Sequence, residues 1–287
     1  MEWEQVLVLW CAGWGAAALV GYALALAGVT GAQRMRHFTG RVERVREPRH
    51  GGSRVGGISV VVSYRDPVSG QDIQVTNDGE RGDAITAAWV GREIRVSHPP
   101  GRPHAYRFSA MAETPGRGLS GPGCAVFLGY VGLVALASVE RGWPWALIGV
   151  GGPGAIVAAV HLPGALRARK DRLGRLAAMD AVRGRVVAVL KDVSVDQDDG
   201  HVSTTITPVV SFSTREGRAV TAHCPSGLPD PAGSYGRDVT VHHTPADPAC
   251  FTLDVEAARR SEAWEIVFDV LAIVVLGATA AAGVALL

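Results

Sequence analysis

The chain has 287 residues and a formal net charge of +1, with 28 Lys plus Arg against 27 Asp plus Glu. This balance argues against a nucleic-acid-binding protein, because such proteins concentrate a basic excess on the binding face. Hydrophobic residues make up 47% of the chain, and long uncharged runs hold most of them. The composition therefore favours a membrane protein with polar loops.

The first of these runs covers residues 5–30 and begins after Glu2 and Glu4. A cleaved signal peptide would begin with positive charge, so we interpret this run as a retained helix. Each run holds about 20 residues or more, enough for a helix to cross a hydrocarbon core about 30 Å thick. Buried helices of a large soluble core are the alternative, but such helices usually keep a polar face. We expect four transmembrane helices, at 5–30, 119–139, 143–163 and 264–287.

The positive charges predict the sidedness of these helices. Of the 28 Lys and Arg residues, Arg141 alone lies outside the two long loops between helices. The positive-inside rule then places both loops in the cytoplasm, with both termini and the hairpin at 140–142 outside. The preference for Arg over Lys, with high Ala, Gly and Val, is typical of GC-rich bacteria. We therefore expect a multi-pass protein of the bacterial inner membrane.

The two long loops repeat one sequence unit. Residues 91–100, Gly-Arg-Glu-Ile-Arg-Val-Ser-His-Pro-Pro, correspond to residues 236–245, Gly-Arg-Asp-Val-Thr-Val-His-His-Thr-Pro. The copies are about 145 residues apart throughout, which indicates a tandem duplication. We assign structural roles to the shared positions, which are Gly40 and Gly184, Gly91 and Gly236, His98 and His243, Pro100 and Pro245, and Pro103 and Pro248.

Each loop has the pattern of a small β module. Apolar residues alternate along 58–64 and again along 206–212, and turn residues follow both runs. We expect two all-β modules, at 38–110 and 183–256, each of about five strands in a rolled sheet or barrel. The pattern does not separate an SH3-like from an OB-like barrel. The basic segment at 166–182 fits either a linker helix that fixes topology or a helix lying on anionic lipid.

These motifs resemble a known family. An opening Gly-x-Val strand occurs at Gly40-Arg41-Val42 and Gly184-Arg185-Val186, and a Pro/aromatic strand occurs at residues 208–212. Residues 236–248 match a closing Gly-x-x-Val-x-Val motif followed by two prolines, with His243 where the family more often has Tyr. The chain is similar to the domain of unknown function 3592 family, small β modules between bacterial membrane helices. The resemblance implies a fold and no activity.

The chain lacks the usual signatures of catalysis. No nucleophile elbow, phosphate loop or His-Glu-x-x-His helix occurs in it. The Asp-rich stretch at 196–200 lacks the closing glutamate of a calcium loop, so we interpret it as a solvated turn. We predict no catalytic, cofactor-binding or metal-binding residues. We leave open whether one His/Cys set of the second module binds metal; this set comprises His223, Cys224, His242, His243 and Cys250.

Two further expectations concern local features. His98 and His243 lie at equivalent strand ends, where capping at a polar surface is favoured over pH sensing. Small residues recur at four-residue spacing in the first helix, at Gly13, Ala17 and Gly21, and in the last, at Gly277, Ala281 and Ala285, which favours close helix packing. The Gly-Gly-Pro-Gly stretch at 151–154 predicts a loosened or kinked third helix.

The sequence thus predicts a non-catalytic scaffold or interaction protein. Its partners would be the lipid bilayer, an unidentified protein and, as a further candidate, a second copy of the chain. The main alternative is an accessory subunit of a transporter or membrane sensor, in which the modules report on the helices. An enzyme ranks third, because no acid, base and nucleophile converge in the sequence.

Overall fold

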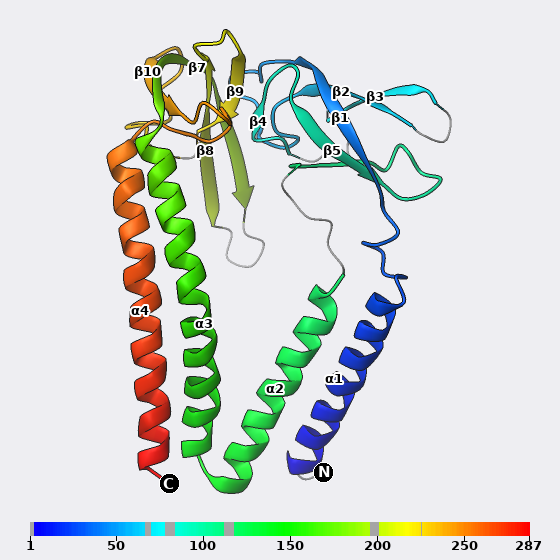
Figure 1. Cartoon of the computed structure of the whole chain (residues 1–287), viewed down its shortest axis with the longest axis vertical. Coiled ribbons are helices and arrows are strands. Elements are labelled where there is room, and N and C mark those ends of the chain that lie inside the picture. The colour runs from blue at the N-terminus through cyan, green and yellow to red at the C-terminus, as the bar shows by residue number, and fades with distance from the viewer. Residues whose placement is uncertain (1–2, 67–69, 78–83, 112–117, 196–200, 225) are drawn as a thin grey trace. The chain divides into compact units, whose positions relative to one another are not determined.

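The computed structural model describes residues 3–66, 70–77, 84–111, 118–195, 201–224 and 226–287. The chain forms two compact units. A helical unit contains Met1–Arg34, Pro115–Leu173 and Arg260–Leu287, and a β unit contains Met35–Thr114 and Gly174–Arg259. Figure 1 shows both units.

Four helices are long and apolar enough to cross a membrane, as the sequence predicts. The third helix contains the expected membrane span at 143–163 and continues into the basic segment, one of whose two interpretations is a linker helix, as far as Ala177. It also stays helical across Pro153 and Pro163. Near its end, Arg172 forms ion pairs of 2.7 Å with Glu262 and 2.9 Å with Glu265 of the fourth helix. The helices are α1 (Trp3–Leu26), α2 (Ser120–Arg141), α3 (Pro144–Ala177) and α4 (Val255–Ala285).

A hydroxyl from α2 compensates for the proline inside α3. Pro153 has no backbone N–H, so it cannot donate to the carbonyl of Gly149 one turn earlier. The hydroxyl of Tyr130 donates to this carbonyl instead. Neighbouring side chains that satisfy a freed carbonyl are one way in which membrane helices tolerate proline. The short hairpin between α2 and α3, which turns at Gly142 with φ of 101°, connects these two helices (Figure 1).

We expect the Tyr130→Phe substitution to destabilise the helical unit by about 1 kcal/mol, since it leaves the Gly149 carbonyl without its donor. The measurement is reversible unfolding of the full chain in mixed detergent micelles, followed by helical circular dichroism. Tyr22→Phe on α1 is the matched control, because this side chain is 39% exposed. Equal effects of the two substitutions would contradict the role given to Tyr130.

Glycines bring the helices close together, but only some of the small residues at four-residue spacing lie where helices touch. A Cβ at Gly151 would lie 2.6 Å from the carbonyl oxygen of Leu276, so α3 and α4 touch through their backbones here. On α1, Gly21 packs against Pro122, whereas a Cβ at Gly13 would meet no atom within 4 Å. Gly277 on α4 is open in the same way. Close packing therefore depends on individual glycines and not on every small residue at four-residue spacing.

The β unit contains two antiparallel sheets. Their strand orders are β3-β2-β1-β5-β6 and β11-β10-β7-β8-β9-β4. The first sheet consists of β1 (Arg36–Val45), β2 (Val60–Arg65), β3 (Asp72–Thr76), β5 (Glu93–His98) and β6 (Arg107–Ser109). The second consists of β7 (Asp180–Val195), β8 (Val202–Ser213), β9 (Ala219–His223), β10 (Asp238–His243), β11 (Phe251–Thr252) and the short β4 (Ala87–Ala88).

The two sheets repeat one topology, as expected for a duplicated module. Leaving β4 aside, the order β3-β2-β1-β5-β6 corresponds strand by strand to β9-β8-β7-β10-β11. The irregularities repeat as well, because the first strand of each copy carries a register shift two residues after its glycine. The matched features are the pairs Gly40–Tyr64 and Gly184–Phe212 and the shifts at Val42/Arg44 and Val186/Ala188. Such bulges increase the local twist of a strand pair.

Candidate functional site

The repeated glycines occupy positions where a side chain would not fit. A Cβ at Gly40 would lie 2.6 Å from Cγ1 of Val62, and one at Gly184 would lie 2.7 Å from Cγ2 of Val241. Gly91 and Gly236 have φ of 85° and 76°, which favours glycine. Their N–H groups donate to the bulged first strands, to the carbonyl oxygens of Val42 at 2.8 Å and Val186 at 2.9 Å.

The repeated histidines lie in the cores, so the expectation that they cap strands at a polar surface is wrong. His98 is 6% exposed and stacks on Phe38 with ring centroids 5.0 Å apart. His243 is 2% exposed and stacks on Phe212 at 5.6 Å. Within the described residues, neither ring nitrogen of His243 has a hydrogen-bond partner. The repeated prolines differ between copies, since Pro248 is buried whereas Pro100, Pro103 and Pro245 are exposed.

The His/Cys set of the second module does not gather into a metal site in the described part of the chain. No group of three or more His, Cys, Asp or Glu side chains there could hold a metal ion. Cys224 and Cys250 are both free. The Asp-rich stretch at 196–200 lies outside the described residues.

The structure instead reveals a joint between the two copies, which the sequence does not predict. Strand β4 belongs to the first copy by sequence, but it pairs with the edge strand β9 of the second sheet. Ala87 lies opposite Ala222, and the N–H of His223 donates to the carbonyl oxygen of Thr86 at 2.8 Å. The next residue, Trp89, is 8% exposed and belongs to the hydrophobic core of the second sheet. The first copy thus supplies both a strand and a core residue to the second.

A loop of the first copy completes the joint by binding strand β7. The N–H of Gly51 donates to the carbonyl oxygen of Val189 at 2.9 Å, and the N–H of Lys191 donates to that of Gly52 at 3.0 Å. The carboxylate of Asp192 accepts hydrogen bonds from the hydroxyl of Ser53 and from the backbone N–H of Arg54. We call residues 50–54 the joint loop; with β4 and Trp89 they form the contact between the copies.

His50 adds an aromatic contact to this loop. Its Nδ1 accepts a hydrogen bond from the N–H of Val189 at 3.1 Å. Its ring stacks on Tyr235 of the second copy, with centroids 3.9 Å apart and planes inclined by 19°. The joint loop is therefore held by backbone bonds, by a carboxylate and by ring stacking.

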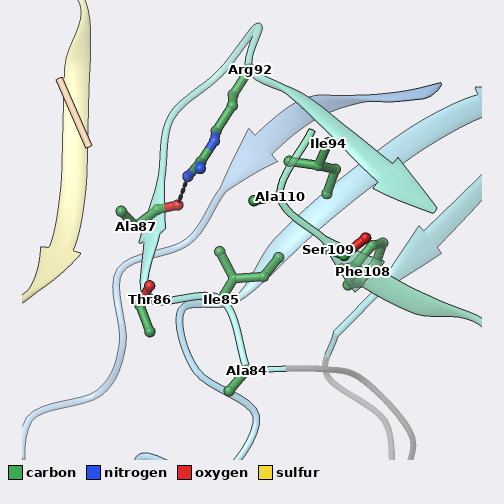
Figure 2. Close-up of a pocket in the computed structure, with 9 residues that line it drawn as sticks. All are labelled: Ala84, Ile85, Thr86, Ala87, Arg92, Ile94, Phe108, Ser109 and Ala110. Carbon is green, nitrogen blue, oxygen red and sulfur yellow. Dashed lines mark hydrogen bonds between the residues drawn. The ribbon is translucent and has the colours of Figure 1, made fainter. Parts of the chain in front are cut away.

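Arg92 fastens β4 from the side of the first copy. Figure 2 shows its guanidinium extending to the carbonyl oxygen of Ala87, to which it donates a hydrogen bond. The same guanidinium lies 4.5 Å from the ring centroid of Trp89, a cation–π distance. Burial lowers the pKa of Arg92 from its ordinary value, and the nearby carboxylate of Asp247 acts in the opposite direction.

Arg92 also lines a cavity of about 190 Å³. Ile94 and Phe108 form part of its wall, and Arg92 is the ionisable residue among the nine that line it (Figure 2). A guanidinium already occupied by a backbone carbonyl and an indole is a structural clamp. Among the described residues that line this cavity, no second acid or base accompanies Arg92.

A second cavity, of about 370 Å³, lies at the joint and contains the buried pair His223 and Cys224. Burial raises the pKa of the Cys224 thiol, which also donates to the carbonyl oxygen of Ser226 at 3.0 Å. A thiol kept protonated in this way is a weak nucleophile. Burial lowers the pKa of His223, the positive charge of Arg54 lowers it further, and Asp192 acts in the opposite direction.

One difference between the two copies lies at the joint. The N–H of Arg92 donates to the carbonyl oxygen of Trp89 at 3.3 Å, and the N–H of Arg237 donates to that of Ser234 at 3.0 Å. Trp89 and Ser234 are therefore equivalent positions of the repeat. A tryptophan that one copy has and the other lacks is the feature that could have indicated a role outside its own module.

No family model, no curated protein and no solved structure matches this chain. The resemblance to the domain of unknown function 3592 family therefore remains a prediction from the repeated motif.

Proposed function

We propose that this chain is a non-catalytic, membrane-anchored interaction protein in which the two β modules act as one binding body. The observation that carries the proposal is the joint. A strand and a tryptophan of the first copy are built into the sheet and core of the second. The joint holds the two copies in one relative position and orientation. This suits a scaffold, which must present two surfaces to its partners in a constant arrangement. The protonated thiol beside His223 and the engaged guanidinium of Arg92 favour this proposal over an enzyme.

We place the four apolar helices in the bacterial inner membrane, with both modules in the cytoplasm and both termini outside. The support is the charge distribution. Of all Lys and Arg residues, Arg141 alone lies outside the two long loops. A cysteine at Ser213, which is exposed on the second module, should resist an impermeant maleimide in intact cells. A cysteine at Glu140, in the hairpin, should react. The reverse pattern of labelling would contradict the proposed sidedness.

An accessory subunit of a transporter is the second candidate, and one feature of the helical unit bears on it. A groove of about 550 Å³ lies between α2 and α3. Its walls are apolar side chains such as Phe127, Val134 and Val157. A path for ions or polar solutes requires polar or charged groups at this depth. The apolar groove is therefore better suited to lipid acyl chains than to a transported polar solute. The groove therefore favours the scaffold over the transport role.

The proposal is tested by in-cell crosslinking and purification of the full chain from native membranes. Three chains are compared: the natural chain, Trp89→Ala at the joint, and the control Val90→Ala, whose side chain is 60% exposed. We expect one protein partner, or a second copy, to be recovered in fixed ratio with the natural chain and with Val90→Ala, and to be lost with Trp89→Ala. Equal recovery with Trp89→Ala, or no partner with any chain, would contradict the proposal.

A further inference from the structure

The two copies differ in how the ends of their sheets are linked. In the first copy, Tyr106 lies directly before the edge strand β6, and its hydroxyl donates to the carbonyl oxygen of Thr76 on the other edge strand, β3. The strand registers make Phe251 and His223 the equivalent residues of the second copy. Phe251 has no hydroxyl, so this link cannot form there. The cavity of about 370 Å³, which Phe251 and His223 both line, lies at this position instead.

Both copies contribute walls to this cavity, which we call the joint cavity. Arg54 of the joint loop and Ala87 of β4 come from the first copy. Phe251 and Leu253 give it an apolar wall from the second copy. Cavities of roughly 300 Å³ or more, with apolar walls and a few polar groups, are typical of small-molecule sites. A molecule held in the joint cavity would therefore touch both copies at once.

Two deeply buried polar side chains of this wall have hydrogen bonds left to make. Thr207 is 3% exposed and His223 is 8% exposed. Nε2 of His223 is buried without a hydrogen-bond partner among the described residues. The hydroxyl of Thr207 makes no hydrogen bond with any residue that the structure describes. Polar side chains buried to this degree normally have a partner, which a ligand in the cavity can supply.

Arg54 gives the joint cavity its positive charge. Its guanidinium is exposed and forms no ion pair or hydrogen bond within the described part of the chain. The nearby carboxylate of Asp192 accepts instead from the backbone N–H of Arg54 and from the hydroxyl of Ser53. The described residues that line the cavity include no Asp or Glu. A guanidinium matches the two oxygens of one carboxylate, so a single arginine suits a monoanion.

We propose that the joint cavity binds a small organic carboxylate, whose charged group pairs with Arg54 and whose ring-sized apolar body packs on Phe251 and Leu253. Because both copies line the cavity, the ligand holds β4 and the joint loop against the second sheet. It stabilises the closed joint increasingly as its concentration rises. This inference rests on the joint and not on a protein partner, so either proposal can fail without the other.

The probe for the test is 4-fluorobenzoate, and its match is 4-fluorobenzamide, which has nearly the same shape and no charge. Fluorine NMR titrations measure binding to the full chain in phosphatidylcholine nanodiscs, with empty nanodiscs as the blank. We expect saturable binding of the benzoate and at least about tenfold weaker binding of the benzamide, the usual effect of losing a charged hydrogen-bonded pair. No saturable binding of the benzoate, or equal binding of both probes, would overturn the proposal.

Matched variants assign the binding to the joint cavity. Arg54→Gln should weaken benzoate binding at least about tenfold, because it removes the cation. Arg102→Gln, at an exposed arginine of the first copy, should leave binding unchanged. Ala249→Leu places a larger side chain in the cavity and should weaken both probes. Circular dichroism checks that each variant is folded. Equal binding by Arg54→Gln and Arg102→Gln would place the site elsewhere and contradict the proposal.

Hydrogen–deuterium exchange tests whether the bound carboxylate couples the copies. The amides of Gly51, Lys191 and His223 bond across the joint. At a benzoate concentration ten times its Kd, we expect exchange at these amides to slow about tenfold, since the ligand binds the closed joint and not the open one. Peptides from the β1–β2 pair should exchange as before. Saturable binding without added protection across the joint would contradict the coupling of the copies by the ligand.

Discussion

Replacement of Trp89 by alanine is expected to lower the free energy of unfolding of the β unit by about 3–5 kcal/mol, the usual cost of removing a large aromatic side chain from a core. Trp89 is 8% exposed and packs with Val186, Val210 and Phe212 of the second sheet. The substitution would leave a cavity in the core of the second copy, although Trp89 belongs to the first copy by sequence. The substitution should therefore loosen the second sheet and release β4 with it.

Chemical denaturation of the full chain in detergent, followed by β-sheet circular dichroism, measures this loss. Val90→Ala is the matched control, because Val90 is the next residue and is 60% exposed. It should change stability by less than about 0.5 kcal/mol. Hydrogen exchange should also show faster exchange in β9 for Trp89→Ala and not for Val90→Ala. If the two substitutions have the same effect, Trp89 does not hold the copies together.

Substitution of the repeated mid-strand glycines by valine should be the second severe change, costing about 3 kcal/mol at each position through overpacking. At Gly184 an added Cβ would already lie 2.7 Å from Cγ2 of Val241 and 3.2 Å from Cβ of Phe212. At Gly40 it would lie 2.6 Å from Cγ1 of Val62. Because the two positions are equivalent in the repeat, we expect losses of similar size.

The same denaturation experiment compares Gly40→Val and Gly184→Val with Gly174→Ala. A Cβ at Gly174, near the end of α3, would meet no atom within 4 Å. There alanine should be neutral or should stabilise the chain by up to about 1 kcal/mol, since glycine is the poorer helix former. A mild effect at Gly184 with a severe one at Gly40 would show that the copies differ in this close approach.

Much of the fold could be predicted from the sequence because its signals are long or repeated. The four helices are visible as apolar runs, which need only length and composition. The corresponding residues 91–100 and 236–245 mark equivalent strands, and the structure gives them equivalent neighbours. Gly40 and Gly184 could be assigned structural roles because both copies keep them at equivalent positions, and the structure gives the reason, since strands pack too closely there for a side chain.

The joint could not be predicted, because nothing periodic marks it. Strand β4 is only the pair Ala87–Ala88, and its partner β9 lies more than a hundred residues further along the chain. The length of α3 beyond the apolar span at 143–163 could be predicted only as one of two alternatives, because the basic segment at 166–182 fits a linker helix as well as a helix on lipid; residues 164–177 contain Leu, Ala and Arg, which favour helix. His98 and His243 were placed at the surface by their polarity, but aromatic partners stabilise them in the cores.

A disulfide between strands β4 and β9 would test the joint between the two copies most sharply. Thr86 and His223 form a hydrogen-bonded pair, so Ala87 and Ala222 are a non-hydrogen-bonded pair, whose Cα atoms lie about 4.5 Å apart in antiparallel sheets. This spacing suits a disulfide. In a chain whose native cysteines are replaced by alanine, Ala87→Cys with Ala222→Cys should cross-link within one molecule on mild oxidation. Ala87→Cys with Ala219→Cys, three residues along β9, should not. An absent cross-link in the first pair, or equal cross-linking in both, would contradict the joint between the two copies.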